Sequence, residues 1–144
     1  MLNMKSSNTA RTRQYLDAVA SGESAERLFE FYSPDVVIEA FPNRIAPQGN
    51  VRRTGEIRAA YEQGKEILRS QNYDVRRIVE SGDEVAVELV WTGILAIPVM
   101  GLPAGSEMKA FVAMFLTFRE GRIISQRNYD CYPPFDAGEQ AAKR

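Results

Sequence analysis

The sequence predicts an α+β domain in which about three N-terminal helices pack on one face of a curved, mostly antiparallel sheet. Two observations lead to this prediction. Apolar residues recur at helical spacing in the first half of the chain, whereas they alternate with a period of two in residues 84–97. Turn pairs, Gly82-Asp83 and Gly121-Arg122, separate successive strand candidates in the second half. A sheet curved over a long helix would form a cone with a pocket at its mouth.

Three helices are expected before residue 70. Asn8 or Thr9 can cap the first helix, which runs to about Ser21, and Ser24 can cap a short second helix. Thr54 can cap the third. The third helix has apolar and small residues at helical spacing, namely Ile57, Ala60, Tyr61, Gly64 and Leu68.

Five strands are expected around and after these helices. The first covers residues 35–41, after a break at Ser33-Pro34-Asp35, and a loop rich in turn residues follows it. Pro133 and Pro134 end the last strand, because proline has no N–H to donate to a sheet. The remaining four strands follow one another through short connections and span residues 72–80, 84–97, 106–120 and about 122–132.

Length and composition bound the organisation of the chain. The 144 residues fit one domain at residues 9–135, between a disordered leader at 1–8 and a polar tail at 136–144. A net charge of −1 argues against a nucleic-acid partner, which would need a basic face.

Two further features bear on where the chain resides. The weakly polar stretch at 92–105 is short and interrupted by prolines, so it does not predict a membrane partner. The single cysteine, Cys131, allows no intrachain disulfide, which suits a cytoplasmic location.

The chain contains no histidine. Serine–histidine and cysteine–histidine nucleophile pairs are therefore excluded, as are histidine-ligated zinc and iron sites. We expect a site without a metal or a cofactor. Proton transfer, if the protein carries it out, must use Asp, Glu, Lys, Tyr or Cys.

The stretch QRNYDCYPPF at 126–135 gathers the most chemistry into ten residues. Strand alternation places Gln126, Asn128, Asp130 and Tyr132 on one face, and the residues between them on the other. The alternation alone leaves open which face points inward.

Three stretches resemble the NTF2-like superfamily, and within it the SnoaL-like group. They are YLDAVASGESAERLFEFYSPDVVIE (15–39), WTGILAIPVMGLPAGSEM (91–108) and FLTFREGRIISQRNYD (115–130). The resemblance covers nearly all of the chain after the leader and implies the cone. It leaves the activity open, because this fold hosts isomerases, cyclases, hydrolases, dehydratases, transport factors and non-catalytic dimerisation modules.

The resemblance also allows known catalytic positions to be compared one at a time. The tyrosine donor of ketosteroid isomerases falls on Tyr15, but their two carboxyl positions fall at about Ala40 and Met114. The Arg and first Asp of limonene-epoxide hydrolases fall at about Leu89 and Trp91. Their second Asp, and the acid/base Asp of SnoaL-type polyketide cyclases, fall on Asn128. Each of these constellations is therefore incomplete in this chain.

The same resemblance implies that Asn128 points into the cone, and Asp130 would then share that orientation. In an apolar pocket, desolvation would raise the pKa of Asp130 and prepare it for acid/base work. The predicted catalytic residues are thus Asp130, with Asn128 and Tyr15 as polar aids. The predicted ligand-binding residues are Trp91, Leu89, Ile38, Ala40, Val112, Met114 and Leu116.

Structural roles for these residues stay open at this stage. Asp130 could form an ion pair with Arg127 or Arg76. Asn128 could satisfy backbone groups at the end of its strand, and Tyr15 and Trp91 could be core aromatics.

Two functions are consistent with the sequence. The first is a small-molecule pocket protein that acts without a cofactor, as an isomerase, cyclase, dehydratase or hydrolase, on an apolar oxygenated compound. The alternative is a non-catalytic ligand-binding or dimerisation module. In either case the resemblance implies a homodimer that forms through the outer face of the sheet, where Phe111, Phe115, Phe118 and Tyr129 would supply aromatic contacts.

Overall fold

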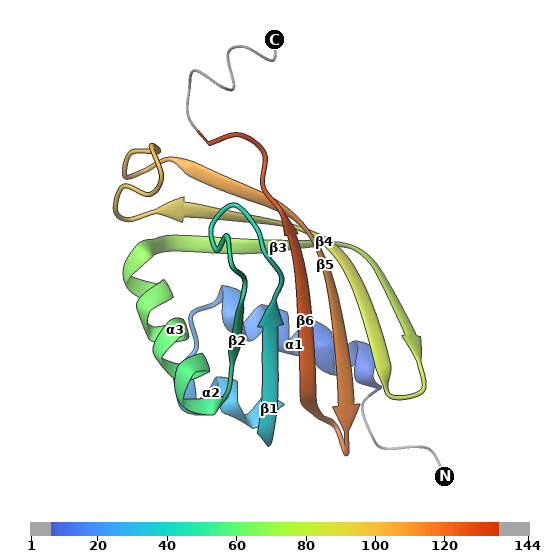
Figure 1. Cartoon of the computed structure of the whole chain (residues 1–144). Helices are drawn as coiled ribbons and strands as arrows, with labels where there is room; N and C mark the ends of the chain where they lie inside the picture. The colour runs from blue at the N-terminus through green and yellow to red at the C-terminus, as the bar shows by residue number, and fades with distance from the viewer. Residues whose placement is uncertain (1–6, 136–144) are drawn as a thin grey trace.

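The computed structural model describes residues 7–135 and confirms the α+β prediction (Figure 1). Within these residues, three α-helices precede most of a six-stranded sheet. The helices are α1 (Asn8–Ala20), α2 (Ala25–Leu28) and α3 (Thr54–Ile67), and a 3-10 turn, η1 (Phe29–Phe31), follows α2 directly.

The sheet is mixed, open and curved, and α1 lies against its concave face (Figure 1). Its strand order is β2-β1-β6-β5-β4-β3. Every neighbouring pair is antiparallel except β1 and β6, which run parallel. The strands are β1 (Tyr32–Ala40), β2 (Asn50–Arg52), β3 (Leu68–Ser81), β4 (Glu84–Leu95), β5 (Glu107–Arg119) and β6 (Arg122–Cys131).

The first strand and its neighbour differ from the sequence prediction. β1 begins at Tyr32 and contains Pro34, which we had predicted to lie in a break. The pairing of β1 with β6 is irregular between Tyr32 and Val37, and a proline is tolerated where the ladder is interrupted. The short strand β2 lies in a segment that we had predicted to be loop.

Other element ends shift by a few residues. The side chain of Ser7 caps α1 by accepting a hydrogen bond from the Ala10 N–H at 3.0 Å, so the helix begins at Asn8, inside the predicted leader. β3 begins at Leu68, directly after α3 and four residues earlier than predicted. Residues 1–6 of the leader and the whole predicted tail lie outside the described residues.

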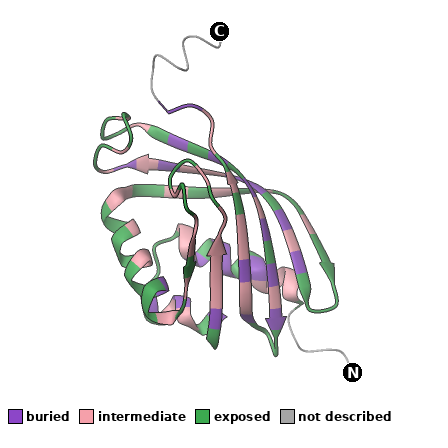
Figure 2. Cartoon of the chain, in the orientation of Figure 1, coloured by how far each residue is buried: buried purple, intermediate pink, exposed green. Residues whose placement is uncertain are grey.

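The core lies between the helices and the concave face of the sheet. Buried and exposed residues alternate along β5 (Figure 2). The even-numbered residues from Met108 to Phe118 are buried, whereas Phe111 and Phe115, which point to the opposite face, are exposed. Our placement of Phe118 on the outer face is wrong. It shares its strand parity with Met114 and is only 2% exposed, so it belongs to the core.

None of the helices between residues 7 and 135 has the length and apolar content that crossing a membrane requires.

Candidate functional site

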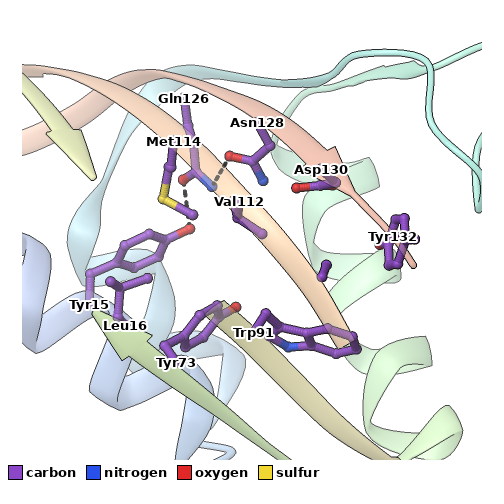
Figure 3. A pocket seen from close by; sticks show the side chains of 11 residues that line it. Tyr15, Leu16, Tyr73, Trp91, Val112, Met114, Gln126, Asn128, Asp130 and Tyr132 are labelled. Carbon is purple, nitrogen blue, oxygen red and sulfur yellow. Dashed lines mark hydrogen bonds between the residues drawn. The ribbon is translucent and has the colours of Figure 1, made fainter. Parts of the chain in front are cut away.

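A cavity of about 160 Å³ lies between α1 and the concave face of strands β3 to β6 (Figure 3). One wall is polar and comes mostly from β6, and the opposite wall is largely aromatic and aliphatic. The lining residues are Tyr15, Leu16, Tyr73, Trp91, Ala110, Val112, Met114, Gln126, Asn128, Asp130 and Tyr132.

Strand alternation on β6 creates the polar wall. Gln126, Asn128 and Asp130 occupy every second position and point into the cavity (Figure 3). Across the sheet, Asn128 pairs with Met114 and Asp130 pairs with Val112, so each polar side chain has an apolar neighbour on β5. This orientation agrees with the one that the family resemblance implied.

Six of the ten predicted site residues meet in this cavity, and four do not. Leu89 and Leu116 face the same side of the sheet but lie in the core, with 1% and 0% of their surface exposed. Ile38 and Ala40 lie on β1, beyond β6, and the cavity does not extend to them. The six that line it are Tyr15, Trp91, Val112, Met114, Asn128 and Asp130.

The sequence prediction did not assign five of the lining residues to the site. Gln126 and Tyr132 had been placed on the correct face by alternation but were given no role. Tyr73 pairs directly with Trp91 across β3 and β4, so the predicted pairing of these strands could have revealed it. Leu16 and Ala110 carry no polar group that would have marked them.

Asp130 is half-buried and unpaired. Among the described residues it has neither a hydrogen-bond partner nor an ion-pair partner. The two arginines that we considered as partners are engaged elsewhere. Arg127 Nη1 donates to Ser125 Oγ at 3.3 Å, and Arg76 Nε forms an ion pair with Asp74 at 2.8 Å. Burial raises the pKa of Asp130, which is the direction expected for a carboxyl in an apolar cavity.

The tyrosines around Asp130 are held in the protonated form. Burial is the main cause that raises the pKa of Tyr73 and of Tyr132, and the charge of Asp130 adds to it in both. No hydrogen bond to a described residue engages the hydroxyl of either tyrosine. Both phenols can therefore donate to a molecule bound in the cavity.

Tyr15 is connected to the polar wall by hydrogen bonds. Its hydroxyl lies 2.6 Å from the Tyr32 hydroxyl and donates to Gln126 Oε1 at 2.8 Å. Gln126 Nε2 donates in turn to Asn128 Oδ1 at 3.2 Å (Figure 3). The Tyr15 proton is thus directed to a protein group, which differs from the direct donor role that the resemblance implied.

Trp91 supplies an apolar surface. Its indole Nε1 donates to Gln71 Oε1 at 2.9 Å, so the polar edge of the ring is already satisfied within the protein. Within residues 7–135, no group of three or more Asp, Glu, Cys or His side chains is placed to hold a metal ion. The absence of a cofactor stays a prediction.

The convex face of the sheet carries an exposed aromatic group. Phe111, Phe115 and Tyr129 are exposed there, and Tyr129 stacks on Phe41 with their ring centroids 4.5 Å apart. These exposed aromatic side chains are the surface on which the predicted homodimer would form. The homodimer stays a prediction, and a measurement of the molar mass of the protein in solution would test it.

Comparison with known proteins identifies the family. A model of the SnoaL-like domain matches residues 12–126. The chain belongs to the SnoaL-like family. This confirms the resemblance to the NTF2-like superfamily on which the sequence analysis relied. No curated protein sequence matches the chain.

Solved structures share the fold. The SnoaL-like chain is similar to IdmH, a proposed polyketide cyclase from Streptomyces antibioticus, with a TM-score of 0.73 and 24% identity over 87% of this chain and 92% of that one. It is also similar to AclR, a proposed hydroxylase from Streptomyces galilaeus, with a TM-score of 0.71 and 17% identity over 85% and 74% of the two chains. A third similar structure is a proposed SnoaL-like polyketide cyclase from Jannaschia sp. CCS1, with a TM-score of 0.69 and 17% identity over 89% of this chain and 91% of that one. At these identities the likeness establishes a common fold.

Proposed function

We propose that this SnoaL-like protein binds a small, largely apolar, oxygenated molecule and transfers a proton with Asp130, without a cofactor. The observation that carries the proposal is the environment of the Asp130 carboxyl. It is half-buried, has no partner among residues 7–135, and lies in a cavity with Trp91 and Val112. A carboxyl with a raised pKa exchanges a proton more readily near neutral pH than an exposed aspartate does.

The rest of the cavity suits a ligand that carries oxygen on an apolar frame. Trp91, Val112, Met114 and Leu16 offer apolar contact, whereas amide and phenol groups offer hydrogen bonds. The names of two similar structures, both proposed polyketide cyclases, support a ligand of the polyketide kind. A cavity of about 160 Å³ accommodates a small molecule or one end of a longer one.

The Kemp elimination of 5-nitrobenzisoxazole tests the base independently of the natural substrate. The carboxylate removes the proton from C3, the electron pair forms the nitrile, and the N–O bond breaks to give the coloured 2-cyano-4-nitrophenolate. We expect the wild-type chain to accelerate this reaction and Asp130→Asn to lower the rate by about 10²-fold or more. Because only the ionised carboxyl accepts a proton, the rate should rise with pH through a midpoint above that of an exposed aspartate.

Asp74→Asn is the matched control, because Asp74 is an exposed aspartate that pairs with Arg76 outside the cavity. It should leave the rate unchanged. Equal rates for the wild-type chain and Asp130→Asn would contradict the proposal.

One observation favours the alternative of a binding module without turnover. Tyr15 and Gln126 form their hydrogen bonds within the protein and not to a ligand. Asp130 is the one carboxyl that lines the cavity among the described residues, so no second carboxyl is there to share acid/base work. Binding of 5-nitrobenzisoxazole without acceleration would favour this alternative.

A further inference from the structure

A chain of four hydrogen-bonding side chains runs from the buried core to the cavity. It passes from Tyr32 to Tyr15, then to Gln126 and finally to Asn128. The last three line the cavity, and their bonds are drawn in Figure 3. Tyr32 is 4% exposed and does not line the cavity, so it forms the closed end of the chain.

The hydroxyls of Tyr32 and Tyr15 together determine the direction in which the protons point. The Tyr32 hydroxyl has only the Tyr15 hydroxyl as a partner among the described residues. A buried O–H without an acceptor is costly, so Tyr32 donates to the oxygen of Tyr15. The Tyr15 proton then has Gln126 Oε1 as its acceptor, at 2.8 Å. Burial raises the pKa of both phenols, so both keep their protons.

This direction propagates through the two amides. Because the oxygen of Gln126 faces Tyr15, its nitrogen faces Asn128 and donates to Oδ1 at 3.2 Å. An amide carries its oxygen and its nitrogen on opposite sides of the group, so Asn128 turns its NH₂ away from Gln126, toward the side of Asp130 (Figure 3). The reverse arrangement would leave the Tyr32 proton without an acceptor.

We propose that Tyr15 and Gln126 are positioning residues that hold the Asn128 amide with its N–H donors toward the ligand. The cavity then presents a fixed donor beside the Asp130 carboxyl, and it selects a ligand with an acceptor oxygen, such as a carbonyl, at that point. The inference rests on the proposed function for the class of ligand, but it does not require turnover.

The carbonyl stretch of acetophenone labelled with carbon-13 at the carbonyl tests the inference. A carbonyl that accepts a hydrogen bond absorbs at lower frequency than one in an apolar solvent. We expect a low-frequency band for acetophenone bound to the wild-type chain, and loss of that band in Asn128→Ala. Tyr15→Phe, which removes one oxygen atom, should weaken the same band and lower the affinity for acetophenone roughly three- to tenfold.

A double-mutant cycle separates positioning from direct donation. If Tyr15 acts through Asn128, Tyr15→Phe has no further effect on the band in the Asn128→Ala background. Additive effects of the two substitutions would overturn the inference, because they would show that Tyr15 donates to the ligand directly.

Two other variants complete the test. Gln126→Met breaks the chain between Tyr15 and Asn128 and should reproduce the loss even if Tyr15→Phe does not fold. Tyr32→Phe is the matched control, because it removes a hydroxyl from the same chain but leaves the Tyr15 proton with Gln126 as its acceptor. Tyr32→Phe should keep the low-frequency band. If acetophenone bound to the wild-type chain absorbs at the same frequency as in an apolar solvent, the inference is overturned.

The spectrum and the elimination assay fail independently. A shifted carbonyl band without any acceleration of 5-nitrobenzisoxazole would contradict acid/base catalysis and support the positioning of Asn128. Acceleration of the elimination without a shifted carbonyl band would support acid/base catalysis by Asp130 and contradict the positioning of Asn128.

Discussion

Replacing Phe31 by alanine is expected to lower the free energy of unfolding by about 3–5 kcal/mol. Phe31 is completely buried in η1, beneath α1. Its ring packs against Tyr15 with centroids 5.7 Å apart, and the Arg11 and Arg27 guanidinium groups lie 4.3 and 5.0 Å from its centroid. Truncation removes all three contacts and leaves a cavity next to Tyr15, which is hydrogen-bonded to Gln126 of the polar wall.

Urea denaturation monitored by circular dichroism measures this loss. A total stability of about 5–15 kcal/mol is usual for a domain, so the change would be a large part of it. Phe31→Leu keeps most of the volume and should cost less than about 1.5 kcal/mol. A loss below about 1 kcal/mol for Phe31→Ala would show that this part of the core repacks freely.

Replacing Gly93 by alanine is expected to displace Trp91 and to cost about 1–3 kcal/mol of stability. Gly93 is a buried residue of β4, and a Cβ there would lie 2.7 Å from Trp91 Cζ2 and 2.8 Å from Leu68 Cδ2. The end of Leu68 can rotate away, but the indole is a rigid plane held by its bond to Gln71. Because Trp91 lines the cavity, its displacement should also lower the rate of 5-nitrobenzisoxazole elimination.

The fluorescence of Trp91 reports this displacement directly, because the chain has one tryptophan. Gly64→Ala is a control with the opposite sign. Gly64 lies inside α3, and apart from its chain neighbours and the backbone of its own helix no atom lies within 4 Å of the position of an added Cβ. Alanine there should therefore stabilise the helix by roughly 0.5–1 kcal/mol. An unchanged emission spectrum in Gly93→Ala would contradict the predicted displacement.

Most of the fold could be predicted from local patterns. The alternation along β4 identified that long strand, and the turns at Gly82 and Gly121 separated it and β6 from their neighbours. β2 was missed because three residues in a loop carry no periodicity. Pro34 misled the prediction of β1, because whether a proline interrupts a strand depends on which ladder bonds the partner strand needs.

The site was predictable only in part. Alternation placed Asn128 and Asp130 on one face, and the resemblance chose the inner face. The same reasoning could not separate Leu89 and Leu116 from the cavity, since depth below α1 depends on how the sheet curves and not on strand parity. The link from Tyr15 to Gln126 joins residues 111 positions apart, and no spacing in the sequence indicates it.

Titration of the Asp130 side-chain carboxyl by carbon-detected NMR, with Asp130→Asn to assign its signal, tests the central claim most directly. Burial without a compensating partner predicts a midpoint above that of an ordinary aspartate. At pH values between the pKa of Asp130 in the unfolded chain and its higher pKa in the folded chain, the folded chain binds more protons than the unfolded chain. The free energy of unfolding therefore falls as the pH rises through this window. Asp130→Asn should therefore melt at a higher temperature than the wild-type chain at neutral pH. A midpoint at or below the ordinary range would show that water or a cation reaches Asp130, and it would contradict the assignment of Asp130 as the acid/base group of the cavity.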